Sequence, residues 1–223
     1  MSKVNMDHAI TLRVMLKDPS VSINEVASYL EGLDFDQRVR ELFTLGRQGQ
    51  RQLYERAQAA APLSLNDFVP AGVDSLTPVH HSGKNTLPIL KPLKLFEKRF
   101  CRADEGSGRL FGYNENPPLL KRGLGLIGFF VAYATDEHAS WQERGGVVID
   151  YFQIPDGKVA DGWPKVIPNT HRLQTFVYNG TRDFMRRVAD GVSIGAAYKG
   201  EKKLDHYFVL ARQPFDHAVA VYA

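Results

Sequence analysis

Cysteine is nearly absent from this sequence, because Cys101 is the single one among 223 residues. One cysteine cannot form an internal disulfide, which predicts a reducing compartment, by default the cytoplasm. The apolar runs fall short of the ~20 residues that a membrane helix needs. The longest candidate, Gly123 to Thr135, is also rich in glycine and reads as a buried strand. The N-terminus lacks an apolar leader with a cleavage site. We therefore expect neither a secretory signal nor a membrane span.

A large charge of one sign is also missing, since 28 basic and 25 acidic residues leave a net charge of +3. The basic clusters at Lys94–Arg102 and Arg182–Arg187 are interleaved with apolar positions. This alternation is typical of strands with one wet face, and not of a stripe that follows phosphates. We expect no nucleic-acid partner.

Motifs that name a reaction are lacking. His80 and His81 are the only adjacent histidines, and neighbours in an extended segment point to opposite sides, so no metal site is expected. The spacing from Gly123 to Gly128 is that of a dinucleotide loop, but it leads into a strand-like run and not into a helix. Cys101 lies beside two arginines, which can activate a thiol, although a cysteine in a strand is more often buried. The sequence identifies no cofactor and assigns no catalytic residue.

Residues 1–62 carry helical signals. Ser22 precedes Glu25 by three positions, which is the spacing of a capping box at a helix start. Asp34 and Gln37 repeat that spacing, and Gly46 interrupts the apolar stripe that follows. We expect the helices of residues 22–60 to pack on the rest of the chain, because their stripe must be buried.

Residues 63–94 form a connector, and five prolines recur from Pro62, just before it, to Pro92. Proline at this density predicts neither a regular helix nor a central strand. Apolar residues such as Phe68 and Val69 continue through it, and a flexible linker would not carry them. The connector is therefore expected to wrap across the following domain and to cover an edge or an open end.

From residue 95 to 223 the pattern changes to the two-residue period of strands. Asn179-Gly180, Asp190-Gly191 and Lys199-Gly200 separate the runs, and Asn-Gly and Asp-Gly supply the positive φ that tight hairpin turns require. Alternating runs predict eight strands: Leu95–Arg102, Arg109–Asn114, Leu124–Thr135, Gly145–Ile154, Arg172–Tyr178, Thr181–Val188, Val192–Tyr198 and Leu204–Arg212. The fold class is α+β, with N-terminal helices packed on an antiparallel, roughly eight-stranded β-barrel. A β-sandwich is the alternative.

Several short runs resemble calycin-type barrels. Phe96-Glu97-Lys98-Arg99-Phe100 and Gly112-Tyr113-Asn114 look like the opening strands of such proteins. Arg182 to Val188, Val192 to Gly195 and Phe208-Val209-Leu210 are similar to the closing strands of lipocalin-like and nitrobindin-type members. The tryptophan-glycine signature usual in the first strand is replaced here by phenylalanines. The resemblance implies that a small, mostly apolar molecule binds in the barrel, and it carries over no catalytic residue.

Aromatic and polar residues within the predicted strands are the candidate ligand-binding set. Asp183 and Arg186, three apart, would lie on opposite faces of a strand, whereas on a short helix they would share one. Tyrosines join an apolar body to a polar tip, which suits them to orienting a ligand. The candidate set is Phe129, Tyr133, Asp150, Tyr151, Asp183, Arg186 and Tyr207. The competing interpretation is a barrel filled by its own aromatic rings, with an ion pair that closes it.

Three functions remain open after the sequence has been read. The first is binding or carriage of a small, mostly apolar molecule in a barrel pocket. The second is an enzyme of the isomerase or cyclase type, which would use tyrosine, aspartate or histidine as acid and base in the same pocket. The third is an interaction module whose N-terminal helices dock on a protein partner. Fold class alone does not choose among them.

Overall fold

The protein folds as a closed antiparallel barrel in which each strand pairs with its neighbours in the sequence and β1 pairs with β8. The structure is a computed structural model that describes residues 11–88, 94–116, 127–170 and 180–215. The strands are Val79–Asn85 (β1), Leu95–Arg102 (β2), Leu110–Glu115 (β3), Phe129–Ala134 (β4), Val147–Asp150 (β5), Thr181–Ala189 (β6), Val192–Lys199 (β7) and Lys202–Arg212 (β8). The predicted α+β class and the barrel are confirmed, and the sandwich alternative is excluded.

The strand β1 lies where the prolines argued against a central strand. His81 is paired with Lys98 of β2 on one side and with Arg212 of β8 on the other. Pro78 and Pro88 flank the strand and do not interrupt it, so its ladder of amide donors is complete. The barrel therefore begins at Val79 and not at Leu95. The predicted strand Arg172–Tyr178 lies outside the described residues.

Two of the tight turns follow the predicted chemistry. Gly191, between β6 and β7, has a φ of 64°, and Gly200, between β7 and β8, has a φ of 57°. Residues other than glycine adopt such angles only at a cost. The meander from β6 to β8 is thus fixed by its turns, as the sequence predicts.

Four helices precede the barrel: Leu12–Lys17 (α1), Ile23–Glu31 (α2), Phe35–Thr44 (α3) and Arg47–Arg56 (α4). Both predicted capping boxes are present, at Ser22 with Glu25 and at Asp34 with Gln37. Gly46 separates α3 from α4, as its position predicts. A further short helix, Ala139–Gln142 (α6), lies between β4 and β5. Among the described residues, no helix is long and apolar enough to cross a membrane.

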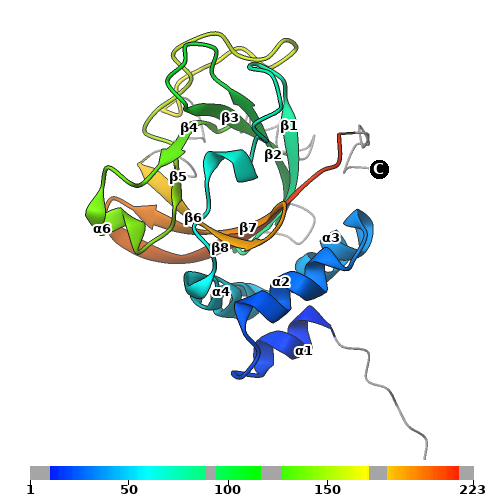
Figure 1. The fold of residues 1–223 in the computed structure, drawn as a ribbon. Helices are drawn as coiled ribbons and strands as arrows, with labels where there is room; N and C mark the ends of the chain where they lie inside the picture. Colours follow the sequence, from blue (N-terminus) through cyan, green and yellow to red (C-terminus); the bar gives the residue numbers. More distant parts are fainter. Residues whose placement is uncertain (1–10, 89–93, 117–126, 171–179, 216–223) are drawn as a thin grey trace, which may run out of the picture.

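The N-terminal helices lie on the outer face of β6, β7 and β8 (Figure 1). Leu30 of α2 and Leu53 of α4 are fully buried in a cluster that includes Ile194 and Val209 of the barrel. Side chains alternate along a strand, so these residues point away from the barrel interior. The apolar stripe of the helices is thus buried against the barrel, as the sequence predicts.

One end of the barrel is closed by the connector. The chain passes through two short 3-10 helices, Ala57–Ala59 (η1) and Leu65–Asp67 (η2), before it enters β1. The Phe68 ring packs 4.9 Å from the Phe100 ring inside the barrel, and the Phe68 carbonyl contacts His81 Nε2 at 3.0 Å. Figure 1 shows this segment lying across the barrel opening.

Candidate functional site

The barrel interior has two halves of different character. Near the closed end it is packed with apolar side chains such as Phe100, Leu110, Met185 and Leu210. Toward the other end lies a cavity of about 110 Å³, called here the inner cavity. Its lining residues are Asn85, Leu87, Phe96, Lys98, Asn114, Asn116, Tyr151, Thr181, Asp183, Ala197, Leu204, His206, Tyr207 and Phe208. The inner cavity therefore joins aromatic walls to a few polar groups, the composition that ligand sites share.

Lys98 is the charged residue at the base of the inner cavity. It sits on β2 opposite Asn114 of β3, and both side chains are buried. Its Nζ donates to Asn114 Oδ1 at 2.7 Å and to the Tyr151 hydroxyl. Asp183 Oδ2 of β6 lies 3.9 Å from the same nitrogen. Lysine is almost never fully buried unless it is paired, and here three partners surround it.

The Tyr151 hydroxyl joins these groups into one network. It accepts from Lys98 Nζ and from Asn114 Nδ2, the latter at 3.0 Å, and it hydrogen-bonds to the Asp183 carboxylate. We call Lys98, Asn114, Tyr151 and Asp183 the polar cluster. Because a buried network is stable only when its members are satisfied, the cluster fixes the position of each of them.

Four aromatic rings surround the Lys98 nitrogen. The ring centroids of Phe96, Phe130, Tyr151 and Phe208 lie 5.6, 4.9, 5.0 and 4.9 Å from Nζ. Ring faces at these distances attract a cation. We call the four rings the aromatic cage.

Glycines on neighbouring strands make room for three rings of the aromatic cage. A Cβ atom at Gly83 would overlap the Phe96 ring, one at Gly112 the Phe130 ring, and one at Gly195 the Phe208 ring. Glycine within a strand often marks such a close approach. The cage is therefore specified by the strands as well as by the rings themselves.

Burial brings the pKa values of the two ionisable groups of the polar cluster closer together. Desolvation lowers the pKa of Lys98, and the nearby Asp183 carboxylate opposes that shift. Desolvation raises the pKa of Asp183, which the Lys98 charge and the Tyr151 hydrogen bond oppose. Because the charged forms lose hydration while they attract each other, the charged and neutral pairs come closer in free energy than in water.

The predicted site residues divide between the two faces of the barrel wall. Tyr151 and Asp183 belong to the polar cluster, and Tyr207 borders the inner cavity while its ring packs 5.7 Å from Tyr54 of α4. Tyr133 and Asp150 meet on the outer face, where the Tyr133 hydroxyl donates to Asp150 Oδ2 at 2.7 Å. Strand parity separates these pairs, so the predicted residues do not form one site.

Phe129 and Arg186 also lie on the outer face. The Phe129 ring packs 5.7 Å from the outward-facing Tyr113. Arg186 donates to the carbonyls of Tyr54, Glu143 and Arg144 at 2.8, 2.6 and 3.1 Å. Asp183 and Arg186 thus occupy opposite faces of β6, as their offset of three predicts for a strand.

Lys98 and Asn114 were missed as site residues in the sequence. Lys98 stands between Phe96 and Phe100 with one residue on either side, so the alternation of β2 places it on an aromatic, inward face. A charged residue two positions from aromatic residues on both sides was the available signal. Gly123 and Gly125, which begin the glycine-rich run predicted as a buried strand, lie outside the described residues.

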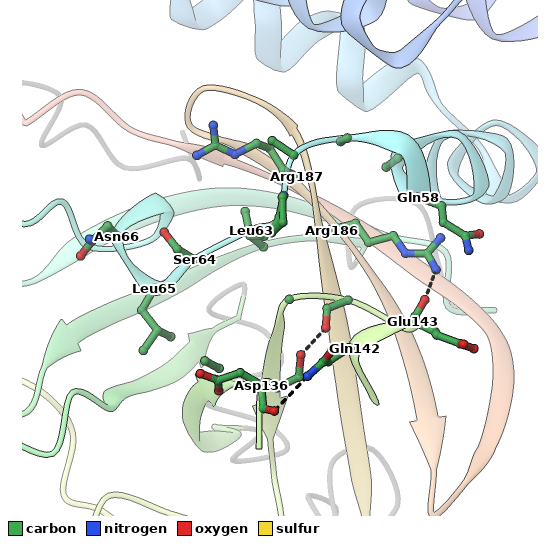
Figure 2. Close-up of a pocket in the computed structure, with 18 of the residues that line it drawn as sticks. Gln58, Leu63, Ser64, Leu65, Asn66, Asp136, Gln142, Glu143, Arg186 and Arg187 are labelled. Atoms are coloured by element: carbon green, nitrogen blue, oxygen red, sulfur yellow. Dashed lines mark hydrogen bonds between the residues drawn. The ribbon is translucent and has the colours of Figure 1, made fainter. Parts of the chain in front are cut away.

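A larger hollow, here the outer groove, lies on the surface between the connector and α6, with a volume of about 850 Å³. Figure 2 shows Ser64, Leu65 and Asn66 on one side, with Gln142 and Glu143 on the other. Its polar contacts are made within the protein: Arg186 donates to the Glu143 carbonyl, and Gln142 donates to the Asp136 carbonyl at 2.9 Å. The outer groove therefore lacks the concentrated, buried chemistry of the inner cavity.

In the part of the chain that the structure describes, neither a metal site nor a reactive thiol is supported. No three histidine, cysteine, aspartate or glutamate side chains there lie close enough to hold a metal ion. Burial raises the pKa of the Cys101 thiol to about 11, so the reactive thiolate is disfavoured. Comparisons with family models, curated proteins and solved structures found no match to this chain.

Proposed function

We propose that the protein binds a small organic molecule in the inner cavity, with an oxygen of that molecule at Lys98 and Tyr151. The observation that carries the proposal is the polar cluster, which sits at the base of the cavity within apolar and aromatic walls. Burying a lysine and an aspartate costs desolvation free energy. Ligand sites have such polar groups, placed within mostly apolar walls to orient the ligand. An eight-stranded barrel is wide enough for one small ligand.

The size of the inner cavity narrows the ligand. Its volume of about 110 Å³ is below the ~150 Å³ of an engineered cavity that holds benzene. A short chain or a single small ring therefore fits, and a long lipid does not fit in the cavity as described. The up-and-down order of the strands is that of lipocalins, which supports the proposed kinship with calycin-type barrels.

Ligand-observed NMR with 1-butanol and butyrate tests this function. We expect at least one of these probes to bind the wild-type protein. Ala197→Leu should abolish the binding, because Ala197 pairs with Asp183 and its enlarged side chain would fill the cavity. Lys202→Met, which removes an exposed lysine at the start of β8, is the matched control and should bind as the wild type does. Binding that persists unchanged in Ala197→Leu would place the ligand elsewhere.

A protein partner at the N-terminal helices stays a prediction. The apolar faces of α2 and α4 are already packed on the barrel, so a partner would have to contact their outward faces.

A further inference from the structure

We infer that Lys98 binds its ligand covalently, by forming an imine with a small aldehyde or ketone. This inference rests on the proposed function and names the chemical class of the ligand. Lys98 is the only amine among the described residues that line the inner cavity. Its Nζ stands at the cavity base, so a carbonyl carbon in the cavity would meet it directly. A desolvated lysine in an apolar pocket is the form of this side chain that acts as a nucleophile toward carbonyls.

The surroundings of Nζ suit the product as well as the free lysine. A protonated imine carries one positive charge on the same nitrogen as the ammonium it replaces. The aromatic cage and the Asp183 carboxylate, 3.9 Å away, therefore serve as neighbours of the charge before and after the reaction. The reaction leaves the net charge of the buried cluster unchanged, so no new charge has to be desolvated.

The polar cluster also supplies a route for the proton. The ammonium proton of Lys98 passes to the Tyr151 oxygen while the Tyr151 proton passes to Asp183, along the hydrogen bonds already present. The neutral amine then attacks the carbonyl carbon, and the C–N bond forms as the C–O π bond breaks. Internal proton transfers give the neutral carbinolamine. The proton held by Asp183 returns through Tyr151 to the carbinolamine hydroxyl, which leaves as water.

The balance of this sequence needs no further reactant. Lysine ammonium and aldehyde give the protonated imine and one water, with one positive charge on each side. Tyr151 and Asp183 end in the protonation states in which they began. The volume of about 110 Å³ limits the carbonyl compound to a short chain or a small ring.

Reductive trapping tests the inference on the full chain. The protein is incubated with butanal and sodium cyanoborohydride, which reduces the imine to a stable secondary amine, and the modified lysine is located by peptide mass spectrometry. We expect Lys98 to be modified at least about tenfold faster than the exposed Lys202, because the bound aldehyde is held beside the amine. Tyr151→Phe should slow the modification of Lys98, since it interrupts the proton route, and leave that of Lys202 unchanged.

Two further variants keep the test decisive. Ala197→Leu, which retains the lysine but fills the cavity, should lose the modification at Lys98 only. Lys98→Met should lose the fast modification and leave that of Lys202 unchanged. The wild type should also bind 1-butanol, which has the chain of butanal without the carbonyl. If the wild type binds 1-butanol and Lys98 is modified no faster than Lys202, the covalent inference is overturned and the proposed function stands. If the wild type binds none of 1-butanol, butyrate and butanal, both fall.

Discussion

Lys98 and Asp183 face each other inside the barrel with 3.9 Å between Nζ and Oδ2, and the Tyr151 hydroxyl contacts both. They come from β2 and β6, which do not pair with each other, so only barrel closure brings them together. The relationship is thus a property of the whole sheet. It also makes each partner depend on the other, because either charge alone would be buried without compensation.

Removing one partner should therefore cost more than removing both. Asp183→Leu leaves the Lys98 ammonium unpaired and should lower the free energy of unfolding by about 3–5 kcal/mol. The double variant Lys98→Met with Asp183→Leu should recover a large part of that loss, since no buried charge remains. Urea unfolding at pH 7 measures both. Asp205→Leu, which breaks an exposed ion pair with Arg51, is the control and should change stability little. If the stability lost in the double variant equals the sum of the losses in Lys98→Met and Asp183→Leu, the two residues are not coupled.

The glycines of the barrel wall should be intolerant of even one methyl group. A Cβ at Gly112 would overlap the Phe130 ring and approach the Arg99 carbonyl, so Gly112→Ala should destabilise the protein by about 1–3 kcal/mol. Thermal or urea unfolding measures the change. Gly72→Ala is the matched control, because a Cβ there meets nothing within 4 Å and its stability should be unchanged or slightly raised. Equal behaviour of the two variants would contradict the account of the aromatic cage.

Arg186 should matter for stability and not for the cavity. Arg186→Met removes the guanidinium that donates to the carbonyls of Tyr54, Glu143 and Arg144, at a cost of about 2 kcal/mol or more, although the Arg144 carbonyl keeps the Tyr54 hydroxyl as a donor. We expect faster proteolysis between α4 and β1, measured as the appearance of a fragment that begins after residue 56. Binding of the cavity probes should be unchanged at temperatures where the variant is folded. Arg40→Met, on the exposed face of α3, should show neither effect. Lost binding in folded Arg186→Met would mean that the outer face contributes to the site.

His81 gives the protein an acid-sensitive contact with its connector. Burial lowers the pKa of His81 from 6.5 to about 3, and Arg212 and His80 push it the same way, while the Phe68 carbonyl and Glu97 oppose the shift. As pH falls, His81 is protonated near pH 6.5 in the unfolded chain but only near pH 3 in the folded protein. The stability that neutral His81 contributes is therefore fully present above pH 6.5 and is lost as pH falls toward 3. This one proton changes the free energy of unfolding by at most about 1.4 kcal/mol per pH unit. His81→Gln, which can still donate to Phe68, should flatten the stability profile between those limits. A variant profile as steep as that of the wild type would refute the assignment.

The sequence predicted the fold better than it predicted the site, for reasons that particular residues make clear. Ser22 with Glu25 and Asp190 with Gly191 act through neighbours in the chain, so their spacing reveals the structure. The strand β1 was missed because Pro78 was read as part of a broken segment, although it stands just outside the strand.

The polar cluster depends on contacts that spacing does not encode. Lys98 and Asp183 are 85 positions apart in the sequence, and which face each one occupies follows from strand parity. Tyr151 and Asp183 were predicted by residue type, as were Asp150 and Arg186, but only the first pair faces inward. Residue type identifies a capable side chain, whereas the register of the closed sheet decides whether it reaches the cavity.

The most direct test of the central claim is a backbone-amide NMR titration of the wild-type protein with butanal, which shows where the ligand binds. If the inner cavity is the site, the largest shifts will occur at Asn114, Thr181 and Ala197, around the cavity. The amides of Ser64 and Gln142, which line the larger outer groove, should stay unchanged. Shifts confined to Ser64 and Gln142, or none at the cavity residues at saturating butanal, would contradict the claim that the barrel interior is the functional site.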